Sequence, residues 1–333
     1  MPEKTSDISI SRVAAEAEVS LGTVSRVFNG HPSVSEDLRR HVLTTGRRLG
    51  FVPKLPRRTL AVITGRHSPA LPVGYVSIVT ALVSRYAEAR GYGVELIDVG
   101  NLDAVLQSHA HAAIGIVFDE RIADLADIPN FPVVTLNHPM VDRGLHSLYT
   151  DHHAQAQVAT EHLLEAGHRE IAFLEIEPDE WGSEQRKRGY LDALAAAGID
   201  TDPTLIQYSS QTPVYDILTR WARCGVTGIL NFSEDAALEV IHILSNVLAL
   251  TIGRDIATVT LEDLPIYQYL SPPQTTVRQP LEAIAEQAVA CAIDAAERLQ
   301  RGETPLPVVD QCFPTELIRR DSVGPPPRVA ATA

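Results

Sequence analysis

Cysteine is scarce in this chain, with only three among 333 residues, and none has the spacing of a zinc ligand pair or a redox motif. Cys224, Cys291 and Cys312 lie far apart, so we expect core side chains rather than a disulfide framework or a zinc site. No apolar run approaches the roughly 18 residues of a membrane-spanning helix, and no charged-then-apolar leader opens the chain. We therefore expect a cytoplasmic protein without membrane contact.

Common catalytic motifs are missing too. The sequence contains no GxSxG, GxxxxGK[ST] or GxGxxG, and the neighbouring carboxylates Glu262 and Asp263 have no evident nucleophile or metal cage nearby. The histidine pairs lack a cysteine or carboxylate at metal spacing, so they are expected to be solvated or to lie on helix faces: His109 with His111, and His152 with His153. We expect no enzyme, no cofactor and no metal.

Charge is plentiful but unevenly placed. The chain carries a net charge of -14, yet residues 1–58 hold ten basic against six acidic side chains, which leaves -18 for the remainder. A small basic head on a large acidic body is the pattern of a protein that binds phosphate at one end only.

Three short helices are expected in this head, with a tight turn between the first two. The second helix starts at Ser20, and the helical spacing of Val24, Val27 and Phe28 places them in the core. The opposite side then presents small polar groups and Arg26, which can form a fork of hydrogen bonds to guanine. This arrangement indicates a helix-turn-helix whose second helix enters the major groove; a solvated face of a small bundle is the alternative.

The stretch ISRVAAEAEVSLGTVSRVFNGHPSVSEDLRRHVLTTGRRLGFVPK resembles the headpiece of the lactose/galactose repressor (LacI/GalR-type) family. This resemblance implies that Leu21, Gly22 and Arg26 read bases. The residues that position the DNA backbone would be Ser20, Thr23, Ser25 and Asn29.

Two features depart from the family pattern. Glu18 stands at a turn position that is usually glycine, where a left-handed backbone costs on the order of 1 kcal/mol. The family's hinge helix is replaced by the short linker 53–58, whose two prolines cannot form that helix. We therefore expect weaker coupling between head and body than is usual in the family, and Leu55 is a poor candidate for its minor-groove wedge.

The body alternates short β-branched runs with helical stretches, the rhythm of parallel doubly wound sheets, in two successive series. Ligands bind such sheets at the carboxyl ends of the strands. The segments AGHREIAF and PPQTTVRQP resemble the family's periplasmic-binding-protein-like core. The resemblance implies three crossings between the lobes, with a first lobe at about 59–152 plus 277–302 and a second lobe at about 153–276 plus 303–320. The head occupies residues 1–52. The tail at 321–333, with its prolines and small residues, is expected to be disordered.

Candidate effector-binding residues follow from the same resemblance. Arg186 matches the arginine that forks onto effector oxygens. Glu262 replaces an aspartate of the second lobe, and Ser233 and Glu234 replace an Asn-Asp pair; a class of ligand different from the family's is therefore an open alternative. Weaker candidates, for which core packing or plain exposure is an equal alternative, are Asn137, Tyr75 and Trp181.

The expected function is that of a transcriptional regulator, most simply a repressor, that binds double-stranded operator DNA as a homodimer. A small molecule, most simply a sugar or sugar derivative, would bind between the lobes and change operator affinity. The alternatives are a DNA-binding regulator that has lost effector response, a small-ligand-binding protein that does not bind DNA, and an enzyme that uses the cleft between the lobes.

Overall fold

The computed structural model describes residues 9–28, 33–51, 58–65, 74–116, 119–136, 138–231 and 234–327. The described residues form two compact units. The first lies within Met1–Ser68, Ile78–Tyr149 and Leu281–Gln311, and the second within Pro69–Ser77, Thr150–Pro280 and Cys312–Ala333. No helix in the described part of the chain is long and apolar enough to cross a membrane.

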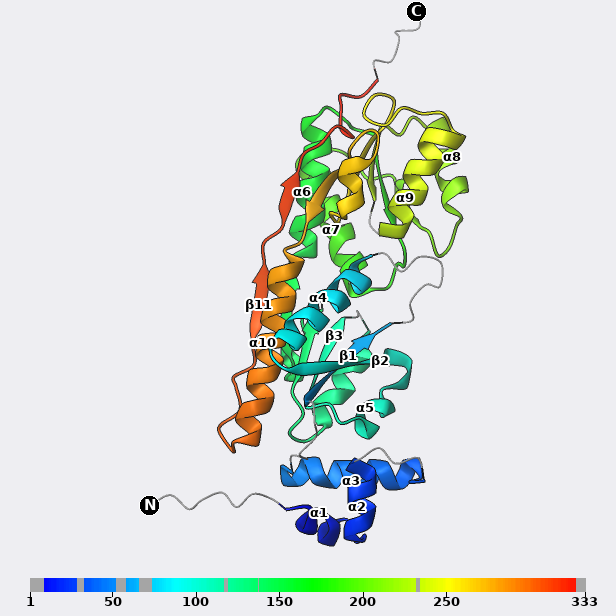
Figure 1. Cartoon of the computed structure of the whole chain (residues 1–333). Coiled ribbons are helices and arrows are strands. Elements are labelled where there is room, and N and C mark those ends of the chain that lie inside the picture. The colour runs from blue at the N-terminus through cyan, green and yellow to red at the C-terminus, as the bar shows by residue number, and fades with distance from the viewer. Residues whose placement is uncertain are drawn as a thin grey trace, which may run out of the picture. The chain divides into compact units, whose positions relative to one another are not determined.

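The head consists of α1 (Ile10–Glu16), α2 (Leu21–Phe28) and α3 (Glu36–Leu49), which lie close together at the blue end of the chain in Figure 1. As the helical spacing predicted, Val24, Val27 and Phe28 are buried in the core of the head. Glu18 adopts a left-handed backbone with φ of 52° in the turn between α1 and α2. Gly50 ends α3 with φ of 74°.

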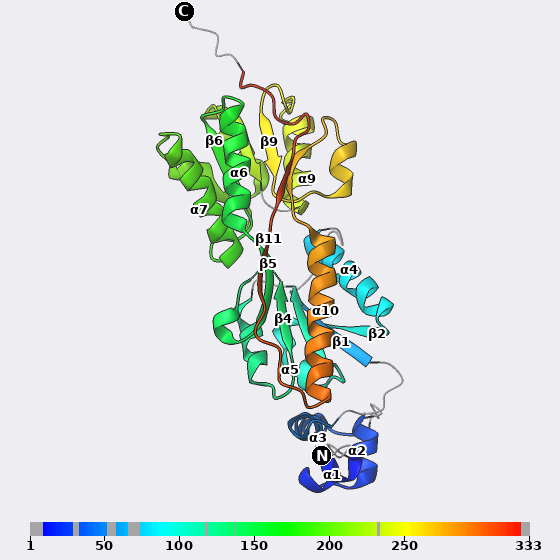
Figure 2. The same cartoon turned by 90° about the vertical axis from the view of Figure 1, so that its left-hand side faces the viewer.

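The first lobe is the body part of the first unit, and its sheet has the strand order β11-β5-β4-β3-β1-β2. The four pairs from β5 to β2 are parallel, and α10 packs on β3 and β4 (Figure 2). All five residues of β3 are buried, as expected for a parallel strand covered on both faces. The elements are β1 (Arg58–Thr64), α4 (Tyr75–Ala89), β2 (Tyr92–Asp98), α5 (Asp103–Gln107), β3 (Ala112–Ile116), β4 (Val133–Leu136), β5 (His146–Thr150), α10 (Leu281–Gln300) and β11 (Asp310–Phe313).

The second lobe, which is the second unit, has a sheet of order β12-β10-β9-β8-β6-β7, in which only β12 runs antiparallel to its neighbour. Helices α6 and α7 pack closely, and Gly189 permits this approach. A Cβ at this position would lie 2.0 Å from the carbonyl oxygen of His153. The elements are α6 (His152–Glu165), β6 (Ile171–Glu175), α7 (Trp181–Ala196), β7 (Ile206–Tyr208), α8 (Val214–Arg223), β8 (Gly228–Asn231), α9 (Glu234–His242), β9 (Ala257–Thr260), β10 (Thr275–Arg278) and β12 (Glu316–Ile318).

The expected fold class is confirmed: a helical head precedes two doubly wound α/β lobes. Residues 303–320 were expected in the second lobe, but β11, which lies within this range, joins the first sheet beside β5. The cysteines were also misread, because Cys224 and Cys312 are exposed and Cys291 is only half-buried. Residues 53–57 of the predicted linker lie outside the described residues, and Arg58 begins β1.

The predicted disordered tail is wrong for residues 321–327. The Ser322 hydroxyl is fully buried, donates to the carbonyl of Thr258 at 2.7 Å and accepts from the amide of Thr275 at 2.8 Å. Two residues on, the Gly324 carbonyl lies 2.8 Å from Nε2 of His168. This segment is therefore part of the second lobe, while residues 328–333 lie outside the described residues.

Candidate functional site

The outer face of α2 is the candidate DNA interface. Ser20 precedes the helix, and its hydroxyl accepts from the amide of Thr23 at 3.1 Å, which fixes the first turn. Leu21 is a large apolar residue but is 51% exposed, so it is not part of the core of the head. Its exposure next to the helix N-terminus suits contact with a base edge or a methyl group in a groove.

Arg26 and Gly22 lie one turn apart on this face. Nε of Arg26 donates to the carbonyl of Gly22 at 3.1 Å, which holds the exposed guanidinium along the helix. A Cβ at Gly22 would meet only Ser20 Oγ at 3.8 Å and Arg26 Nη2 at 3.9 Å, so packing within the protein does not require glycine there. The missing side chain instead leaves the backbone open to close approach by a ligand.

The remaining predicted DNA contacts are only partly placed by the structure. Thr23 and Ser25 are half-buried on α2, whereas Asn29 lies outside the described residues. Several basic side chains of the head are already engaged: Arg48 binds Glu16 at 2.8 Å, and Arg40 lies 3.4 Å from Asp103 of the first lobe. The head's positive charge is thus not all available to phosphate.

The second candidate site is the carboxyl edge of the sheet in the second lobe. Leu174, Asn231, Thr260 and Thr276 form one register row across β6, β8, β9 and β10. Polar side chains gather at and just beyond this row, where ligands of parallel sheets bind. Besides the two threonines of the row, the buried ones include Glu175, Arg186, Asn231, Glu262 and Gln279.

Arg186 and Glu175 form a buried ion pair at this edge. Nε of Arg186 donates to Oε2 of Glu175 at 2.8 Å, and the side chains are 0% and 1% exposed. The other carboxylate oxygen accepts from the amide of Ile176 at 2.9 Å. Burial raises the pKa of Glu175 to about 7, although the Arg186 guanidinium acts to lower it.

Glu262 is the second buried carboxylate. Its oxygens accept from Nε2 of Gln279 and from the amide of Asp263, each at 2.8 Å. Gln279 in turn accepts from the hydroxyl of Thr150 at 2.7 Å. The amide group of Gln279 therefore links Glu262 to Thr150 and holds the carboxylate in one orientation.

Trp181 begins α7 and packs edge-on against His152, with ring centroids 5.7 Å apart. His152 is 1% exposed, and its Nδ1 lies 3.3 Å from Gln155 Oε1 and 3.5 Å from Arg186 Nη1. Of the two expectations for this histidine, His152 meets the second: it lies on a face of α6, and that face is the buried one, so it is not solvated. His153 is partly exposed and pairs with Asp192 at 2.7 Å.

Three predicted effector residues, Arg186, Glu262 and Trp181, thus belong to the second lobe. Tyr75 begins α4 and is half-buried. Ser233 and Asn137 lie outside the described residues, and of Glu234 only its place at the start of α9 is described.

Sequence reasoning missed Glu175, Asn231 and Gln279. Glu175 ends the otherwise apolar strand IAFLE, and a lone charge at the carboxyl end of a buried strand could have identified it. Asn231 offered a similar signal at the end of GILN. Its Oδ1, like Oγ of buried Ser183, has no hydrogen-bond partner among the described residues. Such atoms are suited to bind water or a ligand.

Models of known protein families match most of the chain. Residues 9–54 match the model of bacterial regulatory proteins of the lacI family. Residues 68–219 match the periplasmic binding proteins and sugar binding domain of the LacI family, and residues 160–323 match a periplasmic binding protein-like domain.

Individual relatives span nearly the whole chain. The transcriptional regulator GalR of Escherichia coli is 28% identical over 95% of this chain and 96% of its own length. CelR of Thermobifida fusca is 27% identical over 90% and 94%. The structure of a CelR–cellobiose complex is 26% identical, covers 95% of this chain and 99% of that one, and has a TM-score of 0.67. With its matching headpiece and core, this chain belongs to the LacI/GalR-type family of bacterial DNA-binding transcriptional regulators.

Proposed function

We propose that the protein is a repressor that binds a pseudo-palindromic operator as a homodimer, through Arg26 and the neighbouring residues of α2. A single head offers few base contacts, so two heads are needed for affinity and for recognition of half-site spacing. The exposed Leu21, the bare backbone at Gly22 and the forked Arg26 support this assignment. The phosphate contacts would come from Ser20, Thr23, Ser25 and Asn29.

Operator affinity would be set by a small ligand at the carboxyl edge of the second lobe. The observation that carries this proposal is the polar lining of that edge, where buried Asn231 and Ser183 have no partner among the described residues. Arg186 and Glu262 would bind ligand hydroxyl groups, and Trp181 would offer an apolar ring face. The predicted Tyr75, Asn137 and Ser233 would complete the site.

We take the ligand to be a neutral or amino sugar rather than a sugar acid or phosphate. The buried charged side chains of the described part of the second lobe are Arg186, Glu175 and Glu262. Their formal charges sum to minus one, or to zero when Glu175 is protonated. A carboxylate or phosphate of the ligand would be buried beside two carboxyl groups, and Arg186, the one cation of this set, already pairs with Glu175. For the relative CelR, the ligand in the complex is cellobiose.

Thermal-shift and calorimetric screens can test the ligand class. The panel should contain neutral hexoses and disaccharides, 2-amino sugars, hexuronates and sugar 6-phosphates. We expect stabilisation only by neutral or amino members. A ligand found this way should also change operator affinity, measured by fluorescence anisotropy titration. In the same titrations, a steep decrease of affinity with salt concentration reports phosphate contacts.

The outcomes separate the parts of the proposal. A hit confined to hexuronates or phosphates contradicts the charge argument but keeps ligand control. No hit from the whole panel, with intact operator binding, indicates a regulator that works without a sugar effector. Failure to bind any genomic duplex at low salt contradicts regulation by DNA binding.

A further inference from the structure

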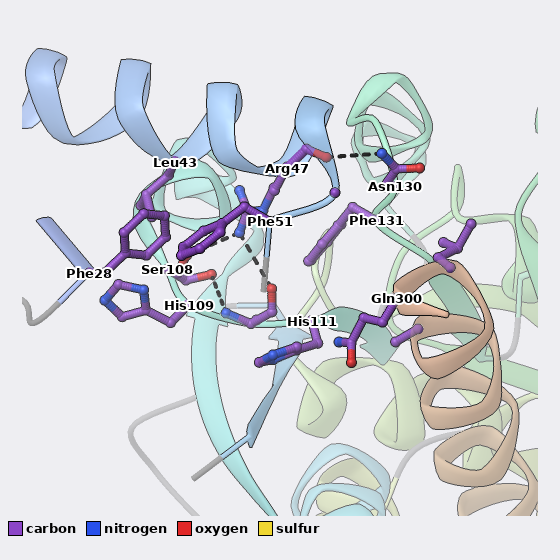
Figure 3. Close-up of a pocket in the computed structure, with 14 residues that line it drawn as sticks. Phe28, Leu43, Arg47, Phe51, Ser108, His109, His111, Asn130, Phe131 and Gln300 are labelled. Atoms are coloured by element: carbon purple, nitrogen blue, oxygen red, sulfur yellow. Dashed lines mark hydrogen bonds between the residues drawn. The ribbon is translucent and has the colours of Figure 1, made fainter. Parts of the chain in front are cut away.

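The head contacts the first lobe through α3, which packs against the short helix α5. Arg47 extends from the last turn of α3 into this contact, and Figure 3 shows its side chain directed toward the segment that contains Ser108. Both partners belong to the first compact unit.

The guanidinium of Arg47 closes the C-terminal end of α5. Nη2 donates to the carbonyls of Val105 at 2.9 Å and Ser108 at 3.0 Å, with Ala110 at 3.5 Å, and Nη1 donates to Leu106 at 3.4 Å. The last carbonyls of a helix lack partners within it, so a forked cation satisfies several at once. Burial lowers the pKa of Arg47 to about 10, which leaves it charged at neutral pH.

The first lobe also contacts the main chain of Arg47 and the face of its guanidinium. Nδ2 of Asn130 donates to the backbone carbonyl of Arg47 at 2.9 Å, and the Phe131 ring centroid lies 5.0 Å from Cζ of the guanidinium. One residue of the head is thus bound by its main chain and its side chain. This double attachment fixes both the position and the orientation of α3.

Apolar packing at the contact is less complete. A small cavity of about 70 Å³ lies between the head and the first lobe, and its lining includes Phe28, Phe51, His109 and Phe131 (Figure 3). Phe51 packs on Phe28, with ring centroids 5.0 Å apart. Unfilled space removes dispersion contacts, whereas the hydrogen bonds of Arg47 are directional and so specify the orientation in which the head docks.

Docking through α3 leaves the reading face of the head exposed. Ser20, Leu21, Gly22 and Arg26 all have exposed side chains or backbone. The docked head can therefore approach DNA, and any movement of the first lobe carries α2 with it.

From this geometry we propose that Arg47 is a positioning residue, which docks each head on its own first lobe and thereby sets the half-site spacing that the homodimer accepts. The proposal rests on homodimeric operator binding. It assigns to Arg47 and the end of α5 the head-to-body coupling that the short linker was expected to weaken.

The test compares the full-length protein with Arg47→Ala, using an operator selected in vitro for the wild type and versions with one or two base pairs added between half-sites. We expect the wild type to lose about tenfold or more in operator affinity with each insertion. The loss of affinity for Arg47→Ala should be several-fold smaller. Affinity for a single half-site should be equal in both. Arg48→Ala is the matched control, because it removes a neighbouring charge that is paired inside the head.

A second variant covers the possibility that Arg47→Ala disturbs the head itself. Asn130→Gly removes the contact from the side of the lobe, and glycine tolerates the φ of 55° found there. Like Arg47→Ala, this variant should make operator affinity depend less on the number of base pairs between the half-sites. Equal spacing profiles for the wild type and both variants would overturn the proposal, whereas a wild type that binds no duplex contradicts the proposed function instead.

Discussion

Nε of Arg186 lies 2.8 Å from Oε2 of Glu175, and water reaches neither side chain to any significant extent. The arginine expected to bind an effector therefore already has a carboxylate partner from its own lobe. A ligand at this site must share Arg186 with Glu175, which makes the ionisation of Glu175 a property of the binding site as well as of the fold.

This ionisation predicts a pH dependence of stability. An unfolded chain releases the Glu175 proton near pH 4.5, whereas in the folded state burial raises the pKa to about 7. Between these values the folded state binds more protons, so the free energy of unfolding falls as pH rises and then levels off.

The measurement is urea unfolding at pH 5, 6, 7 and 8 for the wild type and Glu175→Gln, which cannot titrate. The wild-type free energy minus that of the variant should decrease from pH 5 to pH 7. A difference that is constant or increases across this window contradicts the raised pKa.

Arg26→Ala should weaken operator binding by about 10- to 100-fold, the range for loss of one forked contact to a base. Stability should hardly change, because among the described residues the exposed guanidinium bonds to the Gly22 carbonyl of its own helix alone. Anisotropy titrations with the operator and with an unrelated duplex measure the effect. Arg48→Ala controls for the loss of one charge, and an equal loss on both duplexes would show that Arg26 does not read sequence.

Ser322→Ala should destabilise the second lobe by about 1–3 kcal/mol, because a buried amide and a buried carbonyl would each lose their partner. Thermal and urea unfolding measure the change. Ser210→Ala, at an exposed position, should be nearly silent. If the two variants were equally stable, the segment after Asp321 would contribute nothing to the lobe.

Glu18→Gly should stabilise the head by up to about 1 kcal/mol, since glycine adopts the φ of 52° without strain. Ala15→Gly provides the opposite control, because it places glycine at an exposed position inside α1 and should cost a similar amount. Hydrogen exchange of amides in α1 and α2 reports both effects. A destabilised Glu18→Gly would mean that the Glu18 side chain contributes more than its backbone costs.

Periodicity was sufficient to predict the head and the alternation of strands and helices. The spacing of Val24, Val27 and Phe28 identified the buried side of α2, and apolar runs such as IAFLE and GILN identified buried strands. These signals are local, because each depends on which face of one element meets the core.

Pairings between distant segments could not be predicted in this way. Nothing in the local sequence indicates that β11 lies beside β5, or that Ser322 fills a gap between Thr258 and Thr275. The Glu175–Arg186 pair joins the end of one strand to the following helix, and single-residue propensities do not report such a bond. Arg47 resembled any surface arginine until the first lobe was seen beside it.

The two sides of α2 differ in role: Val24 and Val27 are buried in the core of the head, while Leu21, Gly22 and Arg26 are exposed and lie outside that core among the described residues. Mutation can therefore rewrite the outer side without unfolding the module. Related regulators could diverge toward new promoters by changing a few codons, and an engineer could retarget this one by the same route.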